Sequence, residues 1–197
     1  MDKIIRPALK SESRELAELF DYVARGNNDF GLDYYIWSKQ VVKNQSPFDV
    51  GSKVIASEKD NYSYRNMRVV ECEGKIAGLA LSFVIQKKTA EEIKKIPPLF
   101  SAFNALRQTV IGSFYLDSLT VSPQFRGLGL GKLLVEDTIE KAKAVGNKKI
   151  CLLVFEKNKL AVGLYEKLGF KKIADAVPPN HHAMPYSGNV CLYSRDI

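Results

Sequence analysis

Apolar positions along the chain follow two spacings, one typical of strands and one typical of helices. Short alternating or mostly apolar runs predict strands, and apolar residues three or four positions apart predict helices. The expected strands cover residues 3–8, 68–72, 76–86, 114–121, 149–155, 170–176 and 190–195. The expected helices cover residues 11–23, 32–43, 130–145 and 160–168, and the polar stretch 46–64 is expected to be a connection. Because a strand, a helix and a strand follow one another over 114–155, this part of the chain is expected to form a βαβ unit.

The middle of the chain is expected to contain a hairpin and then a helical insertion. Glu73-Gly74-Lys75 separates two strand patterns and predicts a tight turn. Apolar residues return at helical spacing between 87 and 112, interrupted by Pro97-Pro98. This segment is either an inserted lid or simple cover for the core, because helical spacing serves packing and ligand contact alike. The whole chain, 1–197, is expected to be a single domain with a helical insertion at about 87–112.

Composition and charge narrow the classes of function. The 197 residues are 46% hydrophobic, which excludes a disordered or fibrous chain. The longest nearly apolar stretch, 76–85, is far shorter than the roughly 20 residues of a membrane-spanning helix. The N-terminus lacks the apolar run of a signal peptide, so a cytoplasmic location is expected. With 29 basic and 22 acidic residues the net charge is +7, which favours an anionic ligand, either nucleic acid or a polyphosphate cofactor.

A glycine-rich segment, 124–132, carries the most specific chemistry. It reads Gln-Phe-Arg-Gly-Leu-Gly-Leu-Gly-Lys and lies between an expected strand and an expected helix. Alternating glycines let the backbone approach a ligand closely, and free amides at a helix start favour a phosphate or pyrophosphate. The dinucleotide fingerprint fails because Lys132 stands where its third glycine belongs. The P-loop fails because Arg126 and Leu133 stand where it requires glycine and Ser or Thr.

The pattern that remains, Arg126-x-x-Gly129-x-Gly131, resembles the acetyl-CoA-binding motif of the GNAT N-acetyltransferase superfamily. The resemblance extends to a second motif about 30 residues downstream, which runs from Asn158 to Phe170, and together the matching segments cover roughly 114–173. It implies an α/β fold (a mixed α+β sheet): a central, mostly antiparallel sheet of six to seven strands with a splayed parallel pair, flanked by helices on both faces. It also implies transfer of an acetyl group from the cosubstrate acetyl-CoA to a primary amine, with no metal.

The resemblance assigns a cofactor role to each matching residue. Backbone groups of Leu119, Thr120 and Val121 would pair with the pantetheine arm, and the Leu119 amide would polarise the thioester carbonyl. The pyrophosphate would be held by backbone amides of Arg126, Gly127, Leu128, Gly129, Leu130, Gly131 and Lys132. Asn158 would contact the cofactor arm, or it could cap the helix that follows. Lys157 and Lys159 are either neighbours of the 3′-phosphate or ordinary solvated charges.

Two residues are candidates for acid–base chemistry. By the resemblance, Tyr165 would protonate the departing CoA thiolate, although it could also be a core aromatic on the apolar face of its helix. The acceptor amine needs a base, because its ordinary pKa is about 10.4. Asp117 is the best candidate, since strand alternation places it on the same face as Tyr115 and Leu119. A structural role for Asp117 stays open, and Glu71, Glu73 or water could serve instead.

The remaining chemistry-bearing residues are less specific. Cys72, Cys151 and Cys191 are far apart and are expected to be reduced packing residues. His181 and His182 are adjacent, so their side chains are expected to point apart and not to share a metal, although one could help bind the acceptor.

The acceptor is expected to be a small-molecule or protein amine whose identity the sequence does not give. A homodimer could form through an exposed last strand. The alternative functions are a non-catalytic acyl-CoA sensor and a basic nucleic-acid-binding module. The second is disfavoured because the basic residues are spread along the chain, and no membrane partner is expected.

Overall fold

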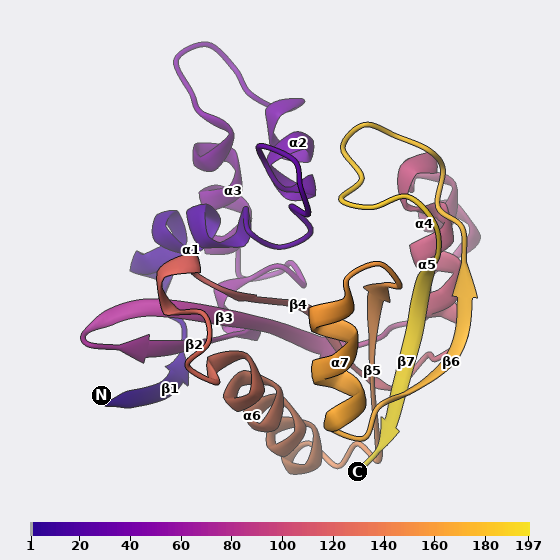
Figure 1. Ribbon diagram of the computed structural model, residues 1–197. Helices are drawn as coiled ribbons and strands as arrows, with labels where there is room; N and C mark the ends of the chain where they lie inside the picture. Colours follow the sequence, from indigo (N-terminus) through magenta and orange to yellow (C-terminus); the bar gives the residue numbers. More distant parts are fainter. Residues whose placement is uncertain (1) are drawn as a thin grey trace. The chain divides into compact units, whose positions relative to one another are not determined.

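The two apolar periods become strands and helices in the computed structural model, which describes residues 2–197 (Figure 1). The strands are β1 (Lys3–Pro7), β2 (Met67–Cys72), β3 (Lys75–Val84), β4 (Phe114–Val121), β5 (Lys149–Phe155), β6 (Lys171–Ala176) and β7 (Val190–Asp196). The α-helices are α1 (Ser13–Phe20), α2 (Leu32–Ser38), α3 (Pro47–Ala56), α4 (Ala90–Lys94), α5 (Ser101–Gln108), α6 (Leu130–Ala144) and α7 (Lys159–Lys167). Single 3₁₀ turns are η1 (Lys10–Glu12), η2 (Tyr64–Asn66), η3 (Pro98–Phe100) and η4 (Pro123–Phe125).

The strands of the described residues form one seven-stranded mixed sheet in the order β1-β2-β3-β4-β5-β7-β6. β1 with β2, β2 with β3, β5 with β7 and β6 with β7 are antiparallel, whereas β4 and β5 are parallel. α6 lies between β4 and β5 along the chain and connects the parallel pair, as a βαβ unit requires. The predicted α/β fold, with a mostly antiparallel mixed sheet and one parallel pair, is confirmed.

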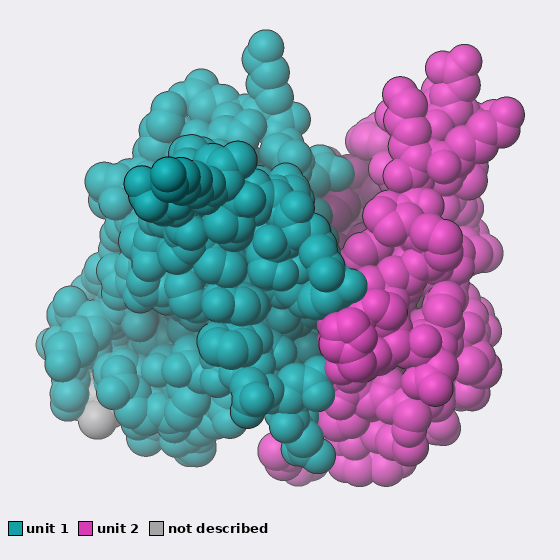
Figure 2. All heavy atoms as spheres, turned by 90° about the horizontal axis from the view of Figure 1, so that it is seen from above, with its two compact units in different colours: residues 1–82, 118–138 teal, residues 83–117, 139–197 magenta. Residues whose placement is uncertain are grey.

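The chain divides into two compact units, which Figure 2 colours separately. Unit 1 contains residues 1–82 and 118–138, and unit 2 contains residues 83–117 and 139–197. The single domain expected over 1–197 remains a prediction. Among the predicted site residues, the glycine loop (residues 124–132) and Leu119–Val121 lie in unit 1, and Asp117, Asn158 and Tyr165 lie in unit 2.

Helix α3 of unit 1 is the element that the sequence pattern missed. The Ser46 hydroxyl accepts a hydrogen bond from the Asp49 amide at 3.3 Å, and the Asp49 carboxylate accepts one from the Ser46 amide at 2.7 Å. This capping box, followed by Pro47 in the first turn, starts the helix despite its polar surroundings. α3 packs against α1 and α2, and a Cβ on Gly51 would come within 2.6 Å of the Trp37 ring. The expectation of a polar connection over 46–64 is therefore wrong for 47–56.

The predicted hairpin joins β2 and β3. Glu73 and Gly74 form a two-residue loop with φ of 55° and 72°, and Cys72 pairs with Lys75 on either side. Positive φ at both central residues is the geometry of a type I′ turn, whose twist matches that of the flanking strands. The hairpin prediction is confirmed.

The insertion of unit 2 is helical, as predicted, and its two helices differ in burial. All of α4 is exposed or nearly so, whereas α5 buries Asn104 and Leu106 and packs against β6 and β7. At the root of the insertion, the Ile85 amide donates to the Ser113 carbonyl at 3.0 Å, and the Gly112 amide donates to the Ile85 carbonyl at 2.9 Å. α5 therefore covers the core of unit 2, and hydrogen bonds join the two ends of the insertion that contains it.

The last strand is not at the edge of the sheet. β7 lies between β5 and β6 and pairs with both, so its backbone groups are already used. The expectation that an exposed last strand could join two subunits is wrong, because the chain inserts β7 between two earlier strands. The edge strand on this side is β6, and a homodimer stays a prediction.

Candidate functional site

The glycine loop joins β4 to α6 through η4. Gly127 and Gly129 have φ of 81° and 77°, a left-handed backbone conformation that residues with a Cβ rarely adopt. A Cβ built on either glycine would meet no atom within 4 Å, so it is backbone conformation and not crowding that calls for glycine here. The Gly129 carbonyl accepts the Leu133 amide at 3.2 Å, which marks the start of α6. Amides of the first helical turn have no partner within their own helix and attract anions.

Side chains on both flanks hold this loop. The Arg126 Nε donates to the Val121 carbonyl at 3.3 Å, and the Lys3 Nζ donates to the Leu128 carbonyl at 2.7 Å. Phe125 is buried two residues before Gly127, and Leu130 is buried directly after Gly129. Arg126 thus ties the loop to the end of β4. That the loop amides are the main anion ligands remains a prediction.

Near the end of β4, the backbone groups of Leu119 face away from β3. The Ser122 amide donates to the Ala77 carbonyl at 2.8 Å, and a Cβ on Gly78 would lie 2.7 Å from the Thr120 carbonyl oxygen. Thr120 and Ser122 therefore turn their backbone groups toward β3. Because successive residues of a strand address opposite edges, the backbone groups of Leu119 and Val121 face the other edge. This is the orientation that pairing with an extended ligand requires.

Asp117 lies at the point where the parallel ladder stops. β4 pairs with β5 through Phe114–Leu116 and Ile150–Leu152, and Asp117 is the next residue of β4. Its side chain is 7% exposed, and its Oδ1 lies 3.3 Å from the Nη1 of Arg107, a residue of α5. A guanidinium at this distance favours the ionised carboxylate. The sequence pointed to Asp117, but it did not reveal this partner.

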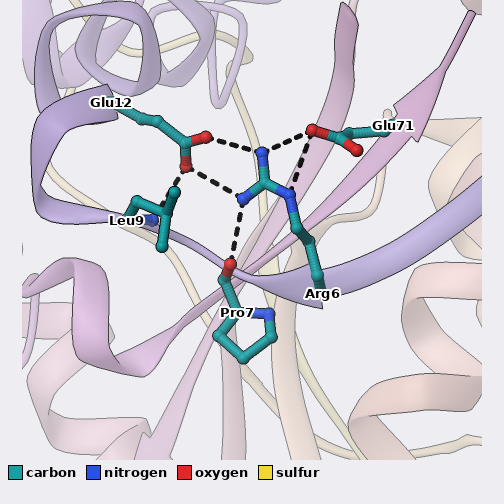
Figure 3. A network of polar contacts seen from close by, with 5 residues as sticks. All are labelled: Arg6, Pro7, Leu9, Glu12 and Glu71. Carbon is teal, nitrogen blue, oxygen red and sulfur yellow. Dashed lines mark hydrogen bonds and ion pairs between the residues drawn. The ribbon is translucent and has the colours of Figure 1, made fainter. Parts of the chain in front are cut away.

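The alternative bases, Glu71 and Glu73, occupy different surroundings. Glu71 Oε1 accepts from Arg6 Nε at 3.0 Å and from Arg6 Nη2 at 2.5 Å, and Arg6 also pairs with Glu12 (Figure 3). Burial acts to raise the pKa of Glu12, but hydrogen bonds from Arg6 and the Leu9 amide outweigh it and lower that pKa. Glu73 is exposed at the hairpin turn. Glu71 is therefore already committed to a network that ties β1, β2 and η1 together.

This network gives a prediction for stability. Arg6→Met leaves two partly buried carboxylates without their shared cation, and we expect it to lower the free energy of unfolding by about 2 kcal/mol at pH 7. The folded-state pKa of Glu12 lies below its ordinary value of 4.5, so this stabilisation is present above pH 4.5 and fades as the pH falls through the lower folded value. Urea unfolding of the wild type and of Arg6→Met at pH 7 and at pH 3.5 measures this loss of stability. An equal loss at both pH values would contradict the role of the carboxylates, and Arg65→Met, at an exposed ion pair, is the control.

Tyr165 is a buried residue of α7. Its side chain is 7% exposed, and its ring meets Phe170 edge to face with the ring centres 5.8 Å apart. Burial raises the pKa of the Tyr165 phenol well above its ordinary value of 10. The phenol is therefore protonated at neutral pH, as a general acid must be, and the same burial suits a core aromatic.

Asn158 and Lys157 make contacts within unit 2. Asn158 precedes α7, and its Oδ1 accepts the Ala161 amide at 3.3 Å, so the helix-cap alternative is realised in the structure. The Lys157 Nζ donates to the Ser187 Oγ at 2.6 Å and so ties this turn to the loop between β6 and β7.

The histidines of that loop stack instead of pointing apart. The His181 and His182 ring centres are 4.3 Å apart with 29° between the planes, and His181 Nδ1 accepts the Ala183 amide at 3.1 Å. The expectation of diverging side chains is wrong, because a turn follows here in place of extended backbone. Across residues 2–197 no group of three or more His, Cys, Asp or Glu residues is arranged to hold a metal ion.

The cysteines are packing residues, as predicted. All three are buried and none is in a disulfide within the described chain. Burial raises the pKa of the Cys151 thiol to about 12, which leaves it protonated and unreactive at neutral pH.

In the part of the chain that the structure describes, no helix has the length and apolar character to cross a membrane.

Comparison with known proteins identifies the family of this chain. The family model described as "Acetyltransferase (GNAT) family" matches residues 32–170, which include β4, the glycine loop and α7. The peptidyl-lysine N-acetyltransferase YjaB of Escherichia coli (strain K12) is 36% identical over 78 residues, 38% of this chain and 50% of that protein. The ribosomal protein bS18-alanine N-acetyltransferase of Salmonella typhimurium is 35% identical over 68 residues, 34% of this chain and 46% of that protein.

Similarity in structure extends over the whole chain. A crystal structure described as an acetyltransferase covers 98% of this chain and 98% of its own, with a TM-score of 0.65 and 25% identity. The aligned sequence, by contrast, spans half or less of the two curated relatives. The family match covers most of the chain and includes both the glycine loop and the downstream motif that contains Tyr165. The chain therefore belongs to the GNAT acetyltransferase family.

Proposed function

We propose that this protein transfers an acetyl group from acetyl-CoA to a primary amine by direct attack of the amine on the thioester. The observation that carries the proposal is the glycine loop, whose left-handed Gly127 and Gly129 leave open space before the first turn of α6. A pyrophosphate is the ligand that such a loop suits best. Membership of the GNAT family supports acetyl-CoA as its source.

In this proposal each residue has one task. Loop amides from Arg126 to Lys132 bind the pyrophosphate, and the outward-facing Leu119 amide polarises the thioester carbonyl. Asp117 takes the proton from the acceptor amine, directly or through water, as the new carbon–nitrogen bond forms. Tyr165 gives its proton to the CoA sulfur as the carbon–sulfur bond breaks. Asn158 orients the cofactor arm in addition to capping α7.

The acceptor is proposed only as a class. The two curated relatives act, by their names, on peptidyl-lysine and on an alanine of ribosomal protein bS18, which supports a protein amine as one acceptor class. A small-molecule amine is equally compatible with the residues described. A cytoplasmic location remains a prediction.

A panel of amines tests the proposal. The purified protein is mixed with acetyl-CoA and, separately, a lysine-containing peptide, an alanine-terminated peptide and a small diamine, and release of the CoA thiol is followed by a thiol reagent. We expect amine-dependent thiol release and an acetylated product of the expected mass with at least one amine. Tight acetyl-CoA binding without transfer to any amine would favour the sensor alternative instead.

A further inference from the structure

Arg107 is a charged residue that neither the sequence pattern nor the proposed chemistry has assigned. It lies on α5, in the insertion, and its side chain is 23% exposed. Its Nη1 lies 3.3 Å from Asp117 Oδ1, and its guanidinium carbon lies 5.8 Å from the centre of the Tyr115 ring. One guanidinium thus touches two residues that alternate along β4.

The three groups influence one another electrostatically. Burial raises the pKa of the Tyr115 phenol above its ordinary range, the negative charge of Asp117 raises it further, and the Arg107 charge opposes both. Asp117 is 7% exposed, so a charge here needs a nearby cation. Arg107 supplies that cation, and its planar guanidinium also fixes the direction from which the carboxylate is held.

The backbone that carries Arg107 is firmly placed within unit 2. The next residue, Gln108, accepts the Lys88 amide at 3.1 Å and donates to the Gln86 carbonyl at 3.3 Å. With the Ile85–Ser113 hydrogen bond, these contacts join the two ends of the insertion. α5 also packs on β6 and β7. A helix held in this way can position a side chain, whereas α4 buries none of its five residues.

We propose that Arg107 is a positioning residue for acetyl transfer, which holds the Asp117 carboxylate on β4 in the orientation and charge state that a base requires. The inserted helix α5 is then part of the catalytic apparatus as well as cover for the core. The inference rests on the proposed function, because it assigns Arg107 a task through the proposed base. Arg107 itself neither gives nor takes a proton in the reaction.

A double-mutant cycle tests this coupling. Arg107→Met, Arg107→Lys, Asp117→Asn and the double variant Arg107→Met/Asp117→Asn are compared for kcat and for KM of the amine that the wild type uses best. We expect Asp117→Asn to lower kcat about 100-fold and Arg107→Met to lower it about 10- to 100-fold. Arg107→Lys should restore part of the loss. In the Asp117→Asn background, Arg107→Met should have almost no further effect, because its task is already gone.

The controls separate the possible failures. Acetyl-CoA affinity and melting temperature are measured for every variant, and Arg65→Met reports the effect of removing an exposed arginine elsewhere. If the wild type transfers acetyl to no amine, the proposed function fails and this inference fails with it. If the wild type is active but Arg107→Met matches it, or if the two substitutions lower kcat independently, the positioning role is wrong and the proposed function stands.

Discussion

Gly129→Val is expected to abolish acetyl-CoA binding in a protein that still folds. Valine cannot adopt the φ of 77° without strain, so the loop must change its path at the start of α6. A loss of two amide hydrogen bonds to a charged phosphate, each contributing about 1.5–3 kcal/mol, corresponds to binding at least about 100-fold weaker. Calorimetric titration with acetyl-CoA measures this directly.

A glycine beyond the other end of α6 provides a matched control for Gly129→Val. Gly146 follows the C-terminal end of α6, also has φ of 77°, and also has no atom within 4 Å of a built Cβ. Gly146→Val therefore imposes comparable backbone strain away from the helix start. We expect a similar fall in melting temperature for both variants and a loss of acetyl-CoA affinity only for Gly129→Val. Equal affinity of the two variants would show that the loop does not bind the cofactor.

Tyr165→Phe is expected to lower the transfer rate about 100-fold or more while acetyl-CoA affinity stays unchanged. Phenylalanine keeps the ring that packs on Phe170 and removes only the hydroxyl. Since burial raises the pKa of Tyr165 above 10, the hydroxyl is protonated throughout the neutral range. The deficit should therefore be similar from pH 7 to pH 9. Steady-state kinetics with the best amine of the panel provides the measurement.

Tyr193→Phe is the matched control for this substitution. Tyr193 is also buried in unit 2, and its hydroxyl lies 3.1 Å from Glu166 Oε1. Its removal costs a hydrogen bond, about 1 kcal/mol of stability, without a proposed role in transfer. If Tyr165→Phe and Tyr193→Phe retained the same kcat as the wild type, Tyr165 would be a core aromatic and not the general acid.

The second half of the fold could be predicted from the sequence nearly residue by residue. β4 and β5 have the predicted bounds, 114–121 and 149–155, because each mostly apolar run is bounded by clear turn residues. The order of strands in the sheet could not be predicted this way. β7 lies between β5 and β6 through pairing of residues distant in sequence, which no local pattern records.

The missed helix and the missed partner of Asp117 have different causes. The capping box of α3 is present in the sequence as Ser46-Pro47-Phe48-Asp49, but the mixed polarity of the segment concealed it. Arg107 is ten residues from Asp117, and nothing in their spacing indicates contact. Their ion pair exists because the ends of the insertion close upon one another and return α5 to β4. Local signals thus placed the glycine loop between a strand and a helix and placed Tyr165 on a helix, whereas the surroundings of the proposed base required the structure.

Binding of acetyl-CoA, CoA and dephospho-CoA to the purified protein tests the central claim most directly. Calorimetry needs no knowledge of the acceptor, so it addresses the cofactor site alone. We expect acetyl-CoA and CoA to bind with similar affinity, and dephospho-CoA to bind more weakly because it lacks the 3′-phosphate. Absence of binding by both acetyl-CoA and CoA would contradict the proposed site, and with it the proposed reaction.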